Sequence, residues 1–129
     1  MSNSKYQHLL ERFESLTVDN GDVDHSVELK ALSDQAIGYN ETARVTFKTH
    51  EEWDEANNLA RLGSLAKKVA TGHELKRDYR ALMATENPSQ TDIKHLSNSI
   101  REYILFSGIA GTLHQATEWA DMLNRLMKL

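Results

Sequence analysis

Apolar side chains recur every three or four residues along most of this chain, which is the spacing of one face of an α-helix. Residues 4–16 show this spacing first and predict an amphipathic helix. After a turn at residues 19–22, a second helix is predicted from Asp24 or His25 to Ile37. We expect it to end at Gly38, because glycine commonly follows the last residue of a helix.

Residues 43–48 have a period of two instead. Val45 and Phe47 alternate with polar neighbours, and this pattern predicts a short strand-like segment. A single strand leaves its backbone groups unpaired. The segment would therefore pair with Thr17 and Val18, pair with a second copy of the chain, or simply be extended.

Cap signatures divide the rest of the chain into helices. Thr49 with Glu52 forms a capping box that opens one long helix, and Thr71 with Glu74 repeats the pattern. We therefore expect the chain to turn at Gly72.

Further signals mark the last two helices. Residues 87–89 end one helix, and Ser89 begins the next, with Asp92 in its first turn. A break is expected between Gly108 and Gly111, followed by a cap formed by Thr112 and Gln115. Together these elements predict an all-α protein, a compact bundle of five to six helices that forms a single helical domain over residues 1–129.

Composition narrows the possible functions. The 129 residues are 40% hydrophobic and 26% charged, which is typical of an ordinary globular protein. There is no cysteine, so disulfides, thiol catalysis and cysteine-ligated metals are excluded. The start of the sequence, MSNSKYQHLL, lacks the apolar core of a signal peptide, and no apolar run is long enough to span a bilayer. We expect a soluble, cytoplasmic protein that does not bind a membrane.

Metal and enzyme motifs are missing. None of the six histidines has another histidine four residues away, and no Glu-x-x-His motif occurs. The acidic turn at residues 19–28 does not match a calcium loop, because valines stand where ligands or glycine are required. No phosphate-binding or nucleophile motif is present. We expect no cofactor, no metal and no catalysis.

Charge is distributed unevenly along the chain. Residues 1–58 have a net charge of −7, whereas residues 61–80 have a net charge of +4. The free amides of a helix beginning near Gly72, close to these basic groups, would suit an anion. The candidate anion-binding residues are Lys67, Lys68, His73, Lys76, Arg77 and Arg80. The simpler interpretation is that solvated lysines and arginines flank a helix corner.

The sequence from His73 to Lys76, HELK, resembles the H-x-L-K core of histidine phosphotransfer domains, which are helical bundles of similar size. The resemblance covers four residues. It implies that His73 would accept a phosphoryl group from a response regulator and that Lys76 would support it electrostatically. It differs from the family at Gly72, which precedes the histidine, and at Arg77, where the family usually has a small residue.

A second apolar stripe on the last helix suggests contact with another chain. Its members are Trp119, Met122, Leu126 and Leu129. Alternatively, they pack on the first helix. We therefore predict a small, acidic, non-catalytic protein-interaction module of the inhibitor, immunity, adaptor or assembly-factor type, which self-associates. The alternatives are phosphate or nucleic-acid binding through residues 61–80, and phosphotransfer by His73.

Overall fold

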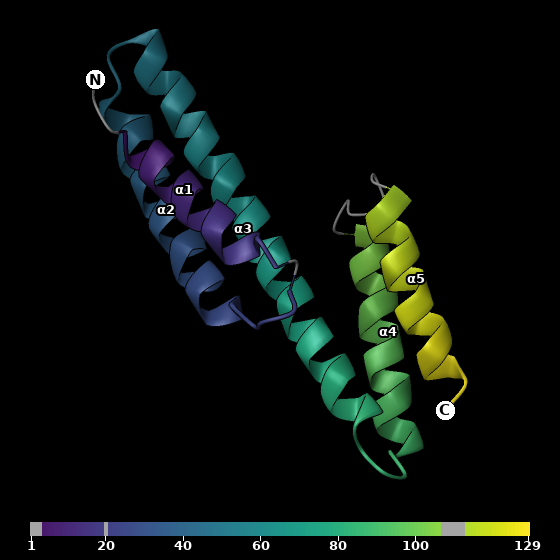
Figure 1. Ribbon diagram of the computed structural model, residues 1–129. Helices are drawn as coiled ribbons and strands as arrows, with labels where there is room; N and C mark the ends of the chain where they lie inside the picture. Colours follow the sequence, from purple (N-terminus) through teal and green to yellow (C-terminus); the bar gives the residue numbers. More distant parts are fainter. Residues whose placement is uncertain (1–3, 20, 107–112) are drawn as a thin grey trace. The chain divides into compact units, whose positions relative to one another are not determined.

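The computed structural model describes residues 4–19, 21–106 and 113–129, and in these residues the regular secondary structure is helical. The helices are α1 (Lys5–Thr17), α2 (Ser26–Thr46), α3 (His50–Met83), α4 (Gln90–Phe106) and α5 (Leu113–Met127) (Figure 1). The predicted all-α class is confirmed, with five helices in the described part of the chain. The break predicted between Gly108 and Gly111, and the cap at Thr112, lie outside these residues.

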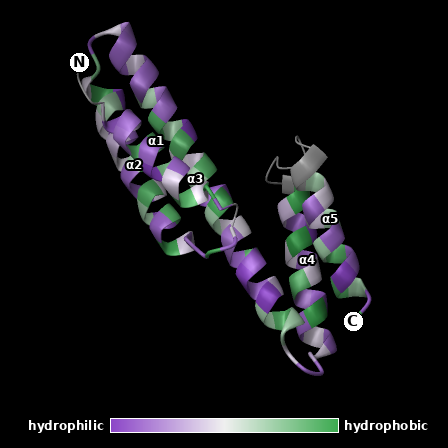
Figure 2. Cartoon of the chain, in the orientation of Figure 1, coloured by the Kyte–Doolittle hydropathy of each residue, from purple (hydrophilic) through white to green (hydrophobic). Residues whose placement is uncertain are grey.

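The chain divides into two compact units, Met1–His73 (unit 1) and Glu74–Leu129 (unit 2). The single domain inferred from the sequence stays a prediction. Each unit has its own core, and apolar positions alternate with hydrophilic ones along its helices (Figure 2). The helices are therefore amphipathic, and burial of their apolar faces is the main driving force for each unit.

Unit 1 consists of α1, α2 and the first part of α3, which lie side by side (Figure 1). Two buried polar side chains of α2 tie it to α3 in an antiparallel arrangement. Ser33 Oγ donates to the carbonyl oxygen of Gly63 at 2.6 Å, and Asn40 Nδ2 donates to that of Ala56 at 2.7 Å. Its core comprises Leu9, Leu29, Leu32, Ala36, Leu59, Leu62, Ala66 and Ala70.

Unit 2 consists of the last part of α3 together with α4 and α5. Its core comprises Leu75, Leu96, Ile100, Tyr103, Trp119, Met122 and Leu126. The rings of Tyr103 and Trp119 pack at 4.9 Å with a tilt of 55°. Such tilted aromatic contacts add stabilisation beyond the area that they bury.

The helix starts predicted at Thr49 and at Ser89 are confirmed. The amide of Glu52 donates to Thr49 Oγ1 at 3.1 Å, and the amide of Asp92 donates to Ser89 Oγ at 3.0 Å. These bonds satisfy amides that have no partner inside the helix. Ser4 caps α1 in the same way through the amide of Gln7.

The prediction of a strand-like segment at residues 43–48 is wrong for most of that segment. The prediction that the second helix ends at Gly38 is also wrong. Helix α2 continues through Gly38 to Thr46, and only then does the chain become extended, at Phe47. Thr46 Oγ1 donates to the carbonyl oxygen of Thr42 at 2.9 Å, within the helix. The alternation of residues 43–48 therefore does not reflect a strand, and this last turn of α2 is largely exposed.

The turn predicted at Gly72 is also wrong, because α3 runs without interruption from His50 to Met83. Thr71 does not cap a helix here. Its hydroxyl donates to the carbonyl oxygen of Lys67 at 3.2 Å, one turn earlier in the same helix. Gly72 is buried within this continuous helix and does not mark a turn.

Candidate functional site

The six predicted anion-binding residues lie on one continuous helix. Lys67, Lys68, Arg77 and Arg80 are exposed, whereas His73 and Lys76 are buried. Because α3 does not begin near Gly72, it offers no helix N-terminus of its own beside these side chains. The helix-end argument for an anion site therefore fails, and anion binding stays a prediction based on exposed charges alone.

His73 is part of the packing of unit 1. Only 4% of its surface is exposed, and its Nδ1 accepts a hydrogen bond from the backbone amide of His25 at 3.2 Å. The two imidazole rings lie 6.1 Å apart. His25 is the residue before α2, and its own side chain does not cap that helix. His73 instead provides a hydrogen-bond acceptor for the backbone amide of His25. Phosphotransfer requires an accessible imidazole, so this burial argues against it.

Lys76 belongs to the interior of unit 2. Its ammonium group donates to Glu118 Oε1 at 2.7 Å and lies 5.6 Å from the centre of the Trp119 ring. Both interactions fix the last part of α3 against α5. The basic charge of Lys76 is thus committed to this ion pair and ring contact, so it does not form part of the exposed charge around it.

The stripe predicted as an exposed partner interface on the last helix is mostly core. Trp119, Met122 and Leu126 are buried in unit 2, and only Leu129 is exposed. The three buried side chains pack with Leu75 of α3 and with the apolar face of α4. The wide apolar face of α5 is explained by its packing against two helices, α3 and α4.

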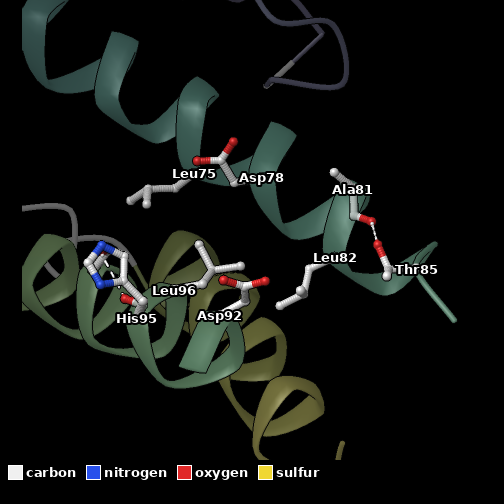
Figure 3. Close-up of a pocket in the computed structure, with 9 residues that line it drawn as sticks. Leu75, Asp78, Ala81, Leu82, Thr85, Asp92, His95 and Leu96 are labelled. Atoms are coloured by element: carbon white, nitrogen blue, oxygen red, sulfur yellow. Dashed lines mark hydrogen bonds between the residues drawn. The ribbon is translucent and has the colours of Figure 1, made fainter. Parts of the chain in front are cut away.

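A groove in unit 2 is a concave site formed entirely by described residues. It has a volume of about 440 Å³ and lies between the last part of α3 and α4 (Figure 3). The residues that line it are Leu75, Asp78, Ala81, Leu82, Thr85, Asp92, His95, Leu96 and Ser99. Its volume falls within the range of ligand-binding pockets in proteins, roughly 300–1,000 Å³.

The groove combines an apolar floor with polar edges. Leu75 and Leu96 are buried, and Leu82 is partly exposed to solvent. Asp78 on α3 and Asp92 on α4 supply exposed carboxylates from the two walls (Figure 3). An apolar group that enters the groove would lose water contact on its leucine face, while a basic group beside it could reach Asp92. Asp78 already accepts a hydrogen bond from Arg77 Nε at 3.1 Å.

The polar groups of the groove do not converge on one point. In the described residues, no three histidine or acidic side chains come close enough together to hold a metal ion. The hydroxyl groups of two lining residues have local partners. Thr85, just after α3, donates to the carbonyl oxygen of Ala81, and Ser99 donates to that of His95 within α4. The arrangement is suited to binding, since it offers surface and charge rather than a paired acid and base.

Sequence reasoning missed this groove. Helical spacing marks Leu75, Leu82 and Leu96 as apolar-face positions, but it does not show that they lie together across two helices. The available signal was Asp78 and Asp92, two carboxylates close to those apolar faces. That signal is weak, because exposed carboxylates occur along the whole chain.

Comparison of the chain with protein-family models, with curated proteins and with solved structures finds no match. Among the described residues, no helix has both the length and the apolar character needed to cross a membrane.

Proposed function

We propose that this protein is a helical protein-interaction module and that the groove of unit 2 receives an apolar side chain of a protein partner. The observation that supports the proposal is the apolar floor formed by Leu75, Leu82 and Leu96 between two helices. Binding there buries mainly the exposed part of Leu82, since Leu75 and Leu96 are already largely buried. Apolar burial is the main driving force of most protein association.

The rim of the groove indicates the chemistry of the partner. Asp78 and Asp92 lie on opposite walls, and the lining contains no lysine or arginine. We therefore expect an amphipathic segment, helical when bound, that presents leucine-like side chains to the floor and a lysine or arginine to the rim. The charges contribute mainly to specificity and to the rate of association, because both carboxylates are exposed.

Substitution of Ala81 with arginine tests the proposal. Ala81 is exposed and lines the groove, so the longer side chain would obstruct the groove without disturbing the core. Ala60→Arg is the matched control, because Ala60 is an exposed alanine of the same helix in unit 1. Partners are captured from the native cell by cross-linking and identified by mass spectrometry.

The expected result is that one partner is captured by the wild type and by Ala60→Arg but is lost with Ala81→Arg. A synthetic peptide of the cross-linked segment should then shift the methyl resonances of Leu82 and Leu96. If Ala81→Arg retains the same partner at the same yield, the groove is not its binding site.

A further inference from the structure

The hydrogen bond between His25 and His73 depends on the protonation state of one ring nitrogen. The backbone amide of His25 donates to Nδ1 of His73 at 3.2 Å, and only 4% of the His73 surface is exposed. A ring nitrogen of histidine accepts a hydrogen bond only while it carries no proton. The contact therefore requires the neutral imidazole of His73, with its proton on Nε2.

This hydrogen bond joins α3 to the segment that leads into α2. We call residues 21–25 the entry segment. His25 is the residue before α2, and Gly21, at the other end of the segment, is buried and has a φ of 85°. Asp24 Oδ1 accepts from the amide of Ser26 at 2.9 Å, which is a local bond at the start of α2. The bond to His73 instead holds the entry segment against a different helix.

Two carboxylates lie close to the ring of His25. Its Nε2 is 3.8 Å from Asp19 Oδ2, and its Nδ1 is 3.9 Å from Glu28 Oε2. A proton on His25 would therefore be paired with carboxylates, and it would leave the backbone amide of His25 able to donate. A proton on Nδ1 of His73 has the opposite effect, because it removes the acceptor.

The basic groups that follow His73 on α3 are paired with carboxylates. Lys76 contacts Glu118 of α5 at 2.7 Å, and Arg77 contacts Asp78 at 3.1 Å. These ion pairs do not involve His73, so its bond to the entry segment responds to its own protonation. The other charged residues close to the two histidines in sequence are Asp22, Asp24 and Glu74.

We propose that His73 is a pH-sensitive switch, which holds the entry segment on α3 while its ring is neutral and releases the segment when the ring is protonated. Protonation turns Nδ1 from an acceptor into a donor that faces a second donor, the amide of His25, and it places a positive charge in a buried position. An ordinary histidine side chain titrates near about pH 6.5, so release belongs to mildly acidic conditions.

The switch is independent of the groove in unit 2, because His73 and the entry segment both belong to unit 1. Ordinary carboxylates remain largely ionised at about pH 5, since they titrate near about pH 4. Protonation of histidine can therefore be separated from the acid titration of the carboxylates.

Nuclear magnetic resonance of the wild type at pH 7.5 and pH 5 tests the proposal. The nitrogen chemical shifts of the His73 ring report its protonation, and relaxation of the backbone amides reports the order of the entry segment. At pH 7.5 we expect a neutral ring and amide order parameters of about 0.85 for residues 21–25. At pH 5 the ring should carry two protons and these order parameters should fall below about 0.6, while those of α4 and α5 stay unchanged.

Three variants separate His73 from the other titrating groups. His73→Asn keeps an acceptor, because the amide oxygen takes the place of Nδ1, but it does not titrate, so the entry segment should stay ordered at both pH values. His73→Leu has no acceptor, and the segment should be disordered at both. His25→Gln removes the other imidazole but keeps the backbone amide, and it should respond to pH like the wild type. Circular dichroism confirms that each variant is helical.

An entry segment that stays ordered at pH 5 while the His73 ring is protonated would overturn the proposal, and so would a His73 ring that remains neutral at pH 5. Loss of the pH response in His25→Gln would also overturn it, because the sensor would then be His25. If a variant of His73 does not fold, the wild type still decides the question, since the ring and the amides are measured on the same sample.

Discussion

At the level of single residues, two polar side chains are buried in the core of unit 1, and each donates a hydrogen bond to a main-chain carbonyl oxygen. Ser33 and Asn40 on α2 each donate to a carbonyl oxygen of α3, at 2.6 and 2.7 Å. A hydrogen bond of this kind contributes only about 1 kcal/mol, but leaving either group buried without a partner would cost more. The two bonds therefore favour one alignment of α2 along α3 over alignments shifted by a residue or a turn.

The ion pair in unit 2 should respond unequally to removal of its two partners. The Lys76 side chain is 10% exposed, whereas the Glu118 side chain is 33% exposed. Glu118→Gln leaves a mostly buried ammonium beside a neutral amide, and we expect it to lower the free energy of unfolding by about 2 kcal/mol. Lys76→Met keeps the length of the side chain and leaves a carboxylate that water can reach, so it should cost less, about 1 kcal/mol. Urea denaturation measures both, and a larger cost for Lys76→Met would contradict the argument.

Tyr103 makes the stability of unit 2 sensitive to alkaline pH. Burial raises the pKa of its phenol from 10.0 to about 12, because the charged form is poorly solvated in the core. Below pH 10 the phenol is neutral in both the folded and the unfolded state, and its contribution to the free energy of unfolding is fully present. Between about pH 10 and 12 the unfolded state ionises first, so up to about 3 kcal/mol of stability is lost.

Tyr103→Phe isolates this effect, since the ring contact with Trp119 is retained. The loss of stability between pH 8 and pH 11.5, measured by urea denaturation, should be smaller in Tyr103→Phe than in the wild type. The difference between the two proteins cancels the contributions of other groups that titrate in this range. Equal losses in the two proteins would show that the phenol ionises as easily in the folded state as in the unfolded state.

At the level of elements, two glycines inside helices have opposite roles. Gly38 in α2 is exposed, and a methyl group added there would meet no atom within 4 Å. Gly63 in α3 is buried against α2, and an added methyl group would lie 2.9 Å from Ile37 Cγ1 and 3.3 Å from the carbonyl oxygen of Ser33. Gly63 therefore allows the two helices to approach closely, which in turn allows the Ser33 hydrogen bond to form.

The pair Gly38→Ala and Gly63→Ala follows from this difference. Alanine is favoured over glycine inside a helix by about 1 kcal/mol, so Gly38→Ala should raise the free energy of unfolding by up to that amount. Gly63→Ala gains the same propensity but forces α2 and α3 apart, and we expect a net loss of about 1–2 kcal/mol. Thermal or urea denaturation of the two variants measures the signs, and equal stabilisation by both would mean that the helices separate at little cost.

At the level of the whole molecule, the described residues form two separate core clusters, one in each unit. Leu32 is fully buried in the core of unit 1, and Ile100 is fully buried in that of unit 2. Replacement of either with alanine should cost about 2–5 kcal/mol. Because the two side chains belong to separate clusters, we expect each substitution to destabilise mainly its own unit.

Hydrogen exchange followed by mass spectrometry shows which unit each substitution destabilises. Leu32→Ala should increase exchange in α1 and α2 more than in α4 and α5, and Ile100→Ala should do the reverse. An equal increase throughout the chain for both variants would show that the two units unfold as one cooperative structure.

The sequence alone determined the all-α class and the helix starts that have a side-chain cap, at Thr49 and Ser89. These features are local, because apolar spacing and a capping hydroxyl act within a few residues. The apolar faces were also recognised, since Leu9, Leu29, Leu96 and Ile100 all lie in a core as their spacing indicated.

Only the tertiary structure decided where α2 and α3 end and which faces meet. In the sequence alone, Gly38 and Gly72 each indicate the end of a helix. In the structure both helices continue, because packing of the surrounding turns stabilises a continuous helix by more than the cost of about 1 kcal/mol for a glycine inside it. The burial of His73, the ion pair of Lys76 and the apolar floor of the groove depend on residues far apart in the sequence. Helical spacing shows that a face is apolar, but it does not show which other helix covers that face, because burial is a property of the assembled helices.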